Sequence, residues 1–308
     1  MNRYPAVLRA VAETPWAILP EKLQAIVDLL VARAAGGAQD QAAAAFILGG
    51  GAREDRKLQV VGSVAILPVT GTIMYRADSL LESSGVTSTQ RLSALLREAL
   101  ADPAVKSIVL DVNSPGGTVP GVMEFADEVL RAREQKRIVA VANPRAASAA
   151  YWIAAAASEL VVMPSGDVGS IGVYTVHEDI SRALEEAGVK VSVMRAGKFK
   201  AEGLPYEPLT DEGRAAVQER LDVHYDRFVK AVAKGRGATA AAVKAGFGQG
   251  RMVLASQAVE AGMADRVGTL EDVVQKLNRA KQGANLPRAE ETSPAQVAAA
   301  RFAAAWKV

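Results

Sequence analysis

The residues whose types and spacing could carry chemistry begin with Ser148, a serine among alanines in the stretch NPRAASAAYWIA, Asn143–Ala154. A strand-like run, RIVAVA, precedes this serine, and a helix-forming run, AAYWIAAAA, follows it. Ser148 is therefore expected at a strand-to-helix turn, where the first helical N–H groups are unpaired and the helix dipole favours negative charge. Such a position suits a nucleophile, although a lone serine there is more often a helix cap or a packing residue.

A second candidate is the turn NSPGG, Asn113–Gly117, which follows a buried-type strand expected at Ile108–Val112. Glycine permits close backbone approach, so this turn could present N–H groups to a phosphate or to a developing oxyanion. Phosphate binding is disfavoured because the phosphate-binding motif GxxxxGK[ST] is absent from the sequence. In a parallel sheet the ends of neighbouring strands share one edge, so the two glycines and Ser148 are expected to face one cleft.

A serine nucleophile needs a base, and this chain has no cysteines and only two histidines, His177 and His224. Two lysines, Lys198 and Lys200, follow in the stretch RAGKFKAEG. A lysine activates serine only when neutral, so its pKa must fall from about 10.4 toward ~7, a shift that burial supplies. The hydroxyl of Ser170, in the segment GSIGV, could hydrogen-bond such an amine and orient its lone pair.

The elements that must position these residues alternate between strands and helices, which predicts an α/β protein with a mostly parallel sheet. Strands are expected at Val60–Gly71, Ile108–Val112, Arg137–Ala142, Leu160–Met163 and Lys190–Ala196. Helices are expected within residues 1–35, Ser79–Ala101, Val119–Arg133, 178–187, Thr210–Lys234, 250–262 and Leu270–Gln282.

Three regions are expected: a helical N-terminal extension and linker (1–58), a catalytic domain (59–282) and a flexible alanine-rich tail (283–308). No apolar run approaches the roughly 18 residues of a membrane span, and the first residues lack a signal-peptide core. We therefore expect a cytoplasmic protein without a stable membrane anchor. The net charge of +2 and the absence of a basic stripe favour no nucleic-acid partner.

Together these stretches resemble the signal peptide peptidase A family of serine peptidases, especially its soluble phage and prophage branch, which processes head proteins during capsid maturation. The resemblance covers about Val60–Glu271. It rests on VLDVNSPGG, the AAS segment before an aromatic-containing helix, PSGDVGSIGV, AGKFK and a distal G-R-x(6)-A-x(3)-G-x-x-D pattern. The segment MNRYPAVL…TPWAILPEKL also looks like the phage branch. The implied fold is a Clp protease/crotonase-like core of repeated ββα units with helices packed on the sheets.

The resemblance implies a Ser–Lys dyad that needs no metal or organic cofactor. Ser148 would be the nucleophile, Lys200 rather than Lys198 the general base, and Ser170 the hydroxyl that orients the lysine. The N–H groups that would hold the oxyanion belong to residues near the nucleophile: Gly117 or Gly116, and Ala149. The resemblance also implies polypeptide substrates and a homo-oligomer, and it leaves open whether the lysine comes from the same subunit or from a neighbour.

Other functions remain open on the sequence. A cellular peptidase that degrades signal peptides would use the same dyad, and a Clp-type Ser–His–Asp triad would use His177. A crotonase-like acyl-CoA enzyme would use the same oxyanion turn but would give no role to Ser148 or Lys200. A non-catalytic assembly component would use the N-terminal helix and the tail as docking segments.

Overall fold

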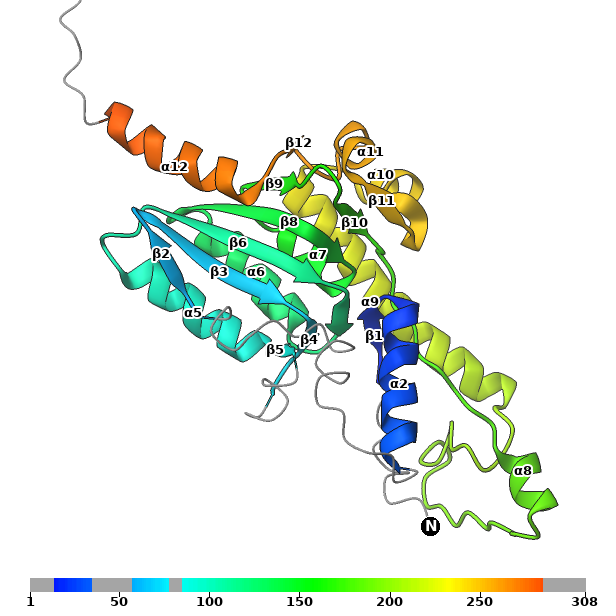
Figure 1. Cartoon of the computed structure of the whole chain (residues 1–308). Helices are drawn as coiled ribbons and strands as arrows, with labels where there is room; N and C mark the ends of the chain where they lie inside the picture. Colours follow the sequence, from blue (N-terminus) through cyan, green and yellow to red (C-terminus); the bar gives the residue numbers. More distant parts are fainter. Residues whose placement is uncertain (1–13, 35–56, 78–84, 285–308) are drawn as a thin grey trace, which may run out of the picture.

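A computed structural model describes residues 14–34, 57–77 and 85–284 (Figure 1). The expectations for residues 1–13, for the linker at 35–56 and for the tail from 285 onward lie outside the described residues. The larger of two sheets has the order β11-β10-β8-β6-β3-β2. Its strands are β2 (Gln59–Val61), β3 (Val64–Thr70), β6 (Ser107–Ser114), β8 (Arg137–Ala147), β10 (Asp167–Gly169) and β11 (Met252–Leu254), and β9 (Glu159–Val162) and β12 (Arg266–Val267) extend it beside β8.

The smaller sheet has the order β1-β7-β4-β5. Its strands are β1 (Trp16–Ile18), β4 (Thr72–Met74), β5 (Val86–Ser88) and β7 (Gly116–Thr118). The chain passes from the larger sheet to the smaller one twice, from β3 to β4 and from β6 to β7, and a helix follows each time. Since β3, β6 and β8 pair in parallel, these repeated ββα units confirm the mixed α/β, Clp protease/crotonase-like core.

The core lies on both faces of the larger sheet because side chains alternate along each strand. In β6, Ile108, Leu110 and Val112 join the main cluster beneath the helices, whereas Val109 joins a second cluster with Val273 of the last helix. Each such fully buried aliphatic side chain contributes about 1.5–3 kcal/mol. Helices α5 (Thr89–Ala101), α6 (Val122–Ala132), α7 (Ala149–Ala154) and α9 (Asp211–Arg236) contribute to the main cluster, as do two shorter helices near the C-terminal end, and α12 (Leu270–Ala284) covers the other face.

One part of the chain extends away from this core. Residues 175–210, called the projecting segment below, contain the short helix α8 (Ser181–Glu186) and lead into α9 (Figure 1). No residue from 175 to 210 is buried. The remaining described elements are α2 (Pro20–Ala34), α10 (Ala240–Gly246), the 3₁₀ turn η2 (Gly248–Gly250) and α11 (Ala255–Glu260).

Several local predictions were wrong. The N-terminal helix begins only at Pro20, because Trp16–Ile18 pair with β7 as a strand. Residues 190–196 form no strand, since an extended segment needs a neighbour to pair with and the described chain offers none there. The run Val60–Gly71 is a hairpin, β2 and β3, and the segment after residue 79 contains β5 before its helix. Within the described ranges, no helix combines the length and apolarity that crossing a bilayer requires.

Candidate active site

Ser148 lies at the junction of β8 and α7, in a backbone conformation that few side chains adopt. Its φ is 53° and its ψ is −117°. A positive φ at a non-glycine residue costs on the order of 1–3 kcal/mol and is concentrated at functional sites. The residue is 1% exposed, and its Oγ is buried without a hydrogen-bond partner among the described residues. Because buried hydroxyls normally find a partner, this strained serine is a candidate for chemistry.

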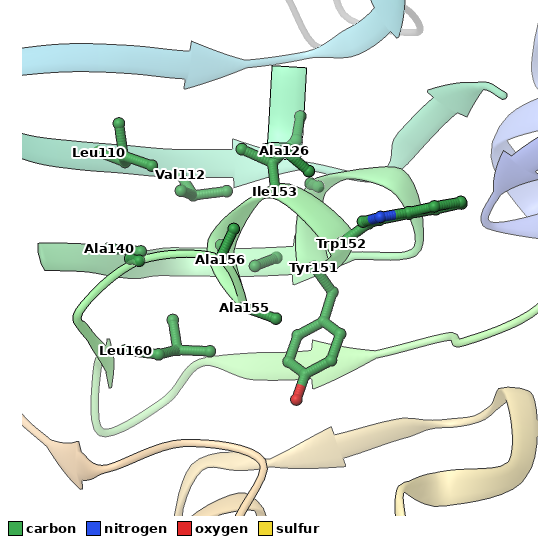
Figure 2. Packing of buried hydrophobic residues seen from close by; sticks show 14 of the residues in the cluster. Leu110, Val112, Ala126, Ala140, Tyr151, Trp152, Ile153, Ala155, Ala156 and Leu160 are labelled. Atoms are coloured by element: carbon green, nitrogen blue, oxygen red, sulfur yellow. The ribbon is translucent and has the colours of Figure 1, made fainter. Parts of the chain in front are cut away.

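Helix α7 holds the strained turn in place through packing rather than through a cap. All six of its residues are buried. Trp152 stacks on Phe228 of α9 with ring centroids 4.4 Å apart, and the Tyr151 hydroxyl donates to the Met263 carbonyl at 2.9 Å. Figure 2 shows Ile153 of the same helix pointing toward β6. Burial of two aromatic rings in so short a helix offsets the cost of the backbone at Ser148.

Ser170 lies beside Ser148 on the neighbouring strand end. β10 pairs in parallel with β8, with Gly169 opposite Ala147, so the two serines are the next residues of adjacent strands. The Ser148 N–H donates to the Gly169 carbonyl at 2.7 Å, and the Ser170 N–H donates to the Arg251 carbonyl at 2.9 Å. Ser170 also has a positive φ, 54°, and is buried. The sheet register therefore brings together two serines that are separated in the sequence.

An ion pair between Arg145 and Asp167 joins the same two strands, three residues before each serine. The guanidinium of Arg145 donates two hydrogen bonds of 2.8 Å to the Asp167 carboxylate. Such a bidentate pair fixes geometry well, but partial exposure limits its contribution to stability to roughly 1 kcal/mol or less. Its main consequence is the register that places Ser170 beside Ser148.

The glycines of NSPGG approach Ser148 from the other side. Gly116 has a φ of +100°, and a Cβ there would lie 3.0 Å from the Ser148 Cβ. A Cβ on Gly117 would lie 1.8 Å from the Ile73 carbonyl oxygen, so only glycine fits. The Gly116 N–H already donates to the Ser114 Oγ at 3.1 Å. The Gly116 N–H is taken up by a side chain of its own turn, so of the two glycine alternatives for an oxyanion donor we favour Gly117, whose N–H faces β1. This choice stays a prediction, along with Ala149, whose N–H begins α7.

The candidate bases are not brought to Ser148 within one chain. Lys200 lies in the projecting segment and is exposed, and the Lys198 ammonium pairs with Glu212 at 2.8 Å. His177 also lies in that segment, and its Nε2 has no hydrogen-bond partner among the described residues. His224 is on α9, where burial and nearby arginines lower its pKa. Among the described residues, no candidate base is hydrogen-bonded to the Ser148 hydroxyl.

The comparisons with known proteins agree with this geometry. The model of peptidase family S49 matches residues 131–284, half of the chain. The chain belongs to peptidase family S49. Three proteins that the chain is similar to are "Head-tail preconnector protein GP5" of Enterobacteria phage P21 (34% identical over 80% of this chain), "Capsid assembly protease C" of Escherichia phage lambda (35% over 73%) and "Putative signal peptide peptidase SppA" of Enterococcus faecium (33% over 70%).

This S49 chain is shorter than those relatives. The matched regions cover 50% of the phage P21 protein, 51% of the phage lambda protein and 63% of the Enterococcus faecium protein. The chain therefore spans about half the length of the two phage relatives. The matched region establishes the family of this chain. The activities named for the full-length relatives are those of the relatives.

The distal pattern of this S49 domain supports the site without touching the nucleophile. The Arg251 carbonyl anchors Ser170, as described above, and Ala258 is fully buried. Asp265 accepts two hydrogen bonds from Arg236, at 2.8 and 2.9 Å, and one from the Leu160 N–H at 2.6 Å. Burial would raise the pKa of Asp265, but these hydrogen bonds hold it below its ordinary value. The pattern thus ties β9, α9 and the end of α11 together.

The sequence analysis missed one element of the candidate site, the strand β1. It interpreted Trp16–Ile18 as part of a helix, but these residues lie along β7 next to Gly116. The signal was available, since prolines at 15 and 20 flank the strand and the residue before a proline favours extended backbone. The candidate active site is therefore bordered by the N-terminal segment as well as by the core that follows.

Proposed function

We propose that this chain is a serine endopeptidase that uses a dyad of Ser148 and Lys200. The observation that carries the proposal is Ser148 itself, a buried serine with a strained backbone and a hydroxyl unpaired among the described residues, which lies next to the glycine turn. A crotonase-like acyl-CoA enzyme would need the glycine turn, but it would have no use for a strained serine at this position. Membership of peptidase family S49 supports the peptidase over that alternative.

The proposed reaction follows from these positions. Neutral Lys200 takes the proton of the Ser148 hydroxyl, and Oγ attacks the carbonyl carbon of a peptide bond. The N–H groups of Gly117 and Ala149 hold the oxygen that becomes negatively charged. The lysine then gives its proton to the departing amine, and water hydrolyses the acyl-serine. Ser170, beside Ser148, would orient the lysine amine.

We propose further that the lysine reaches the serine from a second copy of the chain. A lysine can act as the base only when it is neutral, which burial favours, and Lys200 is exposed in the single chain. The projecting segment displays Val189, Val191, Met194 and Phe199, which are 49%, 40%, 95% and 53% exposed. A run of exposed apolar side chains in an extended segment without a pairing partner fits burial against another subunit.

The proposed biological role is the processing of phage head or scaffold proteins. The support is the similarity to the capsid assembly protease of phage lambda and to the head-tail preconnector protein of phage P21. Degradation of signal peptides is the second candidate, favoured by the similarity to the Enterococcus faecium protein. Incubation with each substrate class, a scaffold protein and a set of synthetic signal peptides, distinguishes the two roles.

The test of the chemistry uses three matched variants. Ser148→Ala and Lys200→Ala should each abolish cleavage of an unfolded protein substrate, whereas Lys198→Ala should keep it, because Lys198 is paired with Glu212. A fluorophosphonate probe should label Ser148 in the unmodified chain. A Lys200→Ala protein that cleaves normally would exclude the dyad, and tight acyl-CoA binding without labelling would favour the crotonase-like enzyme.

A further inference from the structure

The strand β1 lies between two neighbours at the candidate active site. On one side it pairs antiparallel with β7, with Trp16 opposite Thr118, Ala17 opposite Gly117 and Ile18 opposite Gly116. On the other side the Trp16 N–H donates to the Tyr174 carbonyl at 2.9 Å, and the Tyr174 N–H donates back at 3.0 Å. β1 is thus the edge strand of the smaller sheet, and a single bridge to Tyr174 holds its other side, so it lies as a peptide does when it adds to a sheet edge.

The ladder register fixes which carbonyl of β1 faces the glycine turn. The Val119 N–H donates to the Pro15 carbonyl and the Leu19 N–H donates to the Pro115 carbonyl. In an antiparallel ladder the hydrogen-bonded pairs recur at every second residue. Ala17 and Gly117 are therefore the hydrogen-bonded pair between them, and the Ala17 carbonyl oxygen accepts the N–H of Gly117. This N–H is the donor proposed above for the oxyanion.

The peptide bond that contains the Ala17 carbonyl, between Ala17 and Ile18, lies next to Ser148. A Cβ on Gly116 would be 2.2 Å from the Ala17 oxygen, 3.0 Å from the Ile18 Cα and 3.0 Å from the Ser148 Cβ. The bond between Ala17 and Ile18 and the side chain of Ser148 therefore border one small space. All three residues are at most 2% exposed, so β1 leaves no room for a second peptide beside the serine.

We propose that β1 is a built-in substrate mimic, which holds the active site closed until residues 15–19 withdraw. This inference rests on the proposed peptidase function and adds a mode of regulation. The Ala17 carbonyl lies where the scissile carbonyl of a substrate would lie. A bound substrate would pair with β7 along one side and hydrogen-bond to the Tyr174 backbone along the other. The direction of β1 gives the direction in which a protein substrate must run, antiparallel to β7.

The attachment of β1 is compatible with such withdrawal. Trp16 and Ile18 pack in a small satellite cluster with Leu23 and Ile26 of α2, against Tyr174. This cluster is separate from the main core, so β1 and α2 can move as one unit by breaking the β1–β7 ladder while the larger sheet stays intact. Only Ala17 points into the main cluster. A substrate that replaces β1 should therefore carry a small residue at that position.

The first experiment compares two deletions in the full-length protein. Removal of residues 1–19 should lower the KM for a peptide substrate by about tenfold or more while kcat stays the same, because an occupied site reduces apparent affinity by the open fraction. Removal of residues 1–13 keeps β1 and should leave the KM unchanged. A synthetic peptide TPWAILP should inhibit the longer deletion competitively, and TPWFILP, with phenylalanine in place of Ala17, should not.

A second variant decides the question even if the longer deletion does not fold. The chain has no cysteines, and Trp16 and Thr118 face each other as a non-hydrogen-bonded pair, the closest type of cross-strand pair. A Trp16→Cys/Thr118→Cys protein should lose cleavage when oxidised and regain it with a reductant, whereas Thr118→Cys alone should not respond. Equal cleavage by the oxidised and the reduced protein would overturn the proposal.

The outcomes separate this inference from the proposed function. If no form reacts with a fluorophosphonate or cleaves a peptide, the peptidase itself is wrong, and the mimic with it. If every form reacts and cleaves with the same KM, the peptidase stands and only the role of β1 is wrong. A new N-terminus at Ile18 in the unmodified protein, absent from Ser148→Ala, would support the mimic, since it places the Ala17 carbonyl at the nucleophile.

Discussion

The two halves of the proposed dyad lie in contrasting surroundings. Ser148 is buried at the edge of a parallel sheet, where strand register and an aromatic-rich helix fix its backbone. Lys200 lies in the projecting segment, in which no residue is buried. The surroundings of Ser148 thus form within one chain, whereas Lys200 lies among exposed apolar side chains such as Met194 and Phe199. The comparison suggests that assembly of subunits, rather than folding of one subunit, switches the chemistry on.

Mixing two inactive variants tests this contrast most strongly. If Lys200 serves the serine of a neighbour, Ser148→Ala and Lys200→Ala subunits, dissociated and reassembled together, should regain activity. Random assembly in equal amounts restores about a quarter of the sites, since half of the subunits supply each intact group. The measurement is peptide cleavage before and after mixing. A dyad formed within one chain would leave the mixture as inactive as its components.

Replacing one aromatic ring near Ser148 and one near Lys200 should distinguish residues that stabilise the single chain from residues that act in the contact between subunits. Trp152→Ala removes a buried ring stacked on Phe228 and should cost about 3–5 kcal/mol in the free energy of unfolding. Phe199→Ala changes a half-exposed ring of the projecting segment and should alter the stability of the isolated subunit by about 0.5 kcal/mol or less. Denaturant unfolding at low protein concentration measures both. A large loss for Phe199→Ala would mean that the segment already packs within one chain.

A charge in the projecting segment should affect activity but not folding. Met194 is 95% exposed, so Met194→Asp is tolerated by the single chain, but it would bury a carboxylate in the proposed contact between subunits. We expect a roughly tenfold or larger loss of cleavage and a smaller particle in sedimentation, with an unchanged unfolding midpoint. Met194→Leu, which keeps the side chain apolar, is the control. Full activity of Met194→Asp would place the interface elsewhere.

The same contrast explains what the sequence could predict. The strands around Ser148 were predictable because buried parallel strands leave unbroken apolar runs such as RIVAVA, and their shared edge follows from topology. Residues 190–196 have a strand-like sequence but no pairing partner in the described chain, so the local pattern alone gave the wrong prediction. The prediction for β1 failed for a different reason. The flanking prolines favour extended backbone, but the segment becomes a strand only by pairing with β7, about a hundred residues away in the sequence.

The smallest expected effect is a difference in acid sensitivity between two aspartates, one in each half. Hydrogen bonds from Arg236 and Leu160 keep the pKa of Asp265 below its ordinary value despite burial. A carboxylate whose pKa is lower in the folded chain stabilises it above the unfolded-state pKa, and this contribution is lost as the pH falls through the folded-state value. From roughly pH 5 downward, Asp265→Asn should therefore flatten the fall in stability, measured by thermal unfolding. Asp179, whose pKa is lowered by Ser181, is fully exposed in the projecting segment, and Asp179→Asn should leave that curve unchanged because solvent screens the interaction.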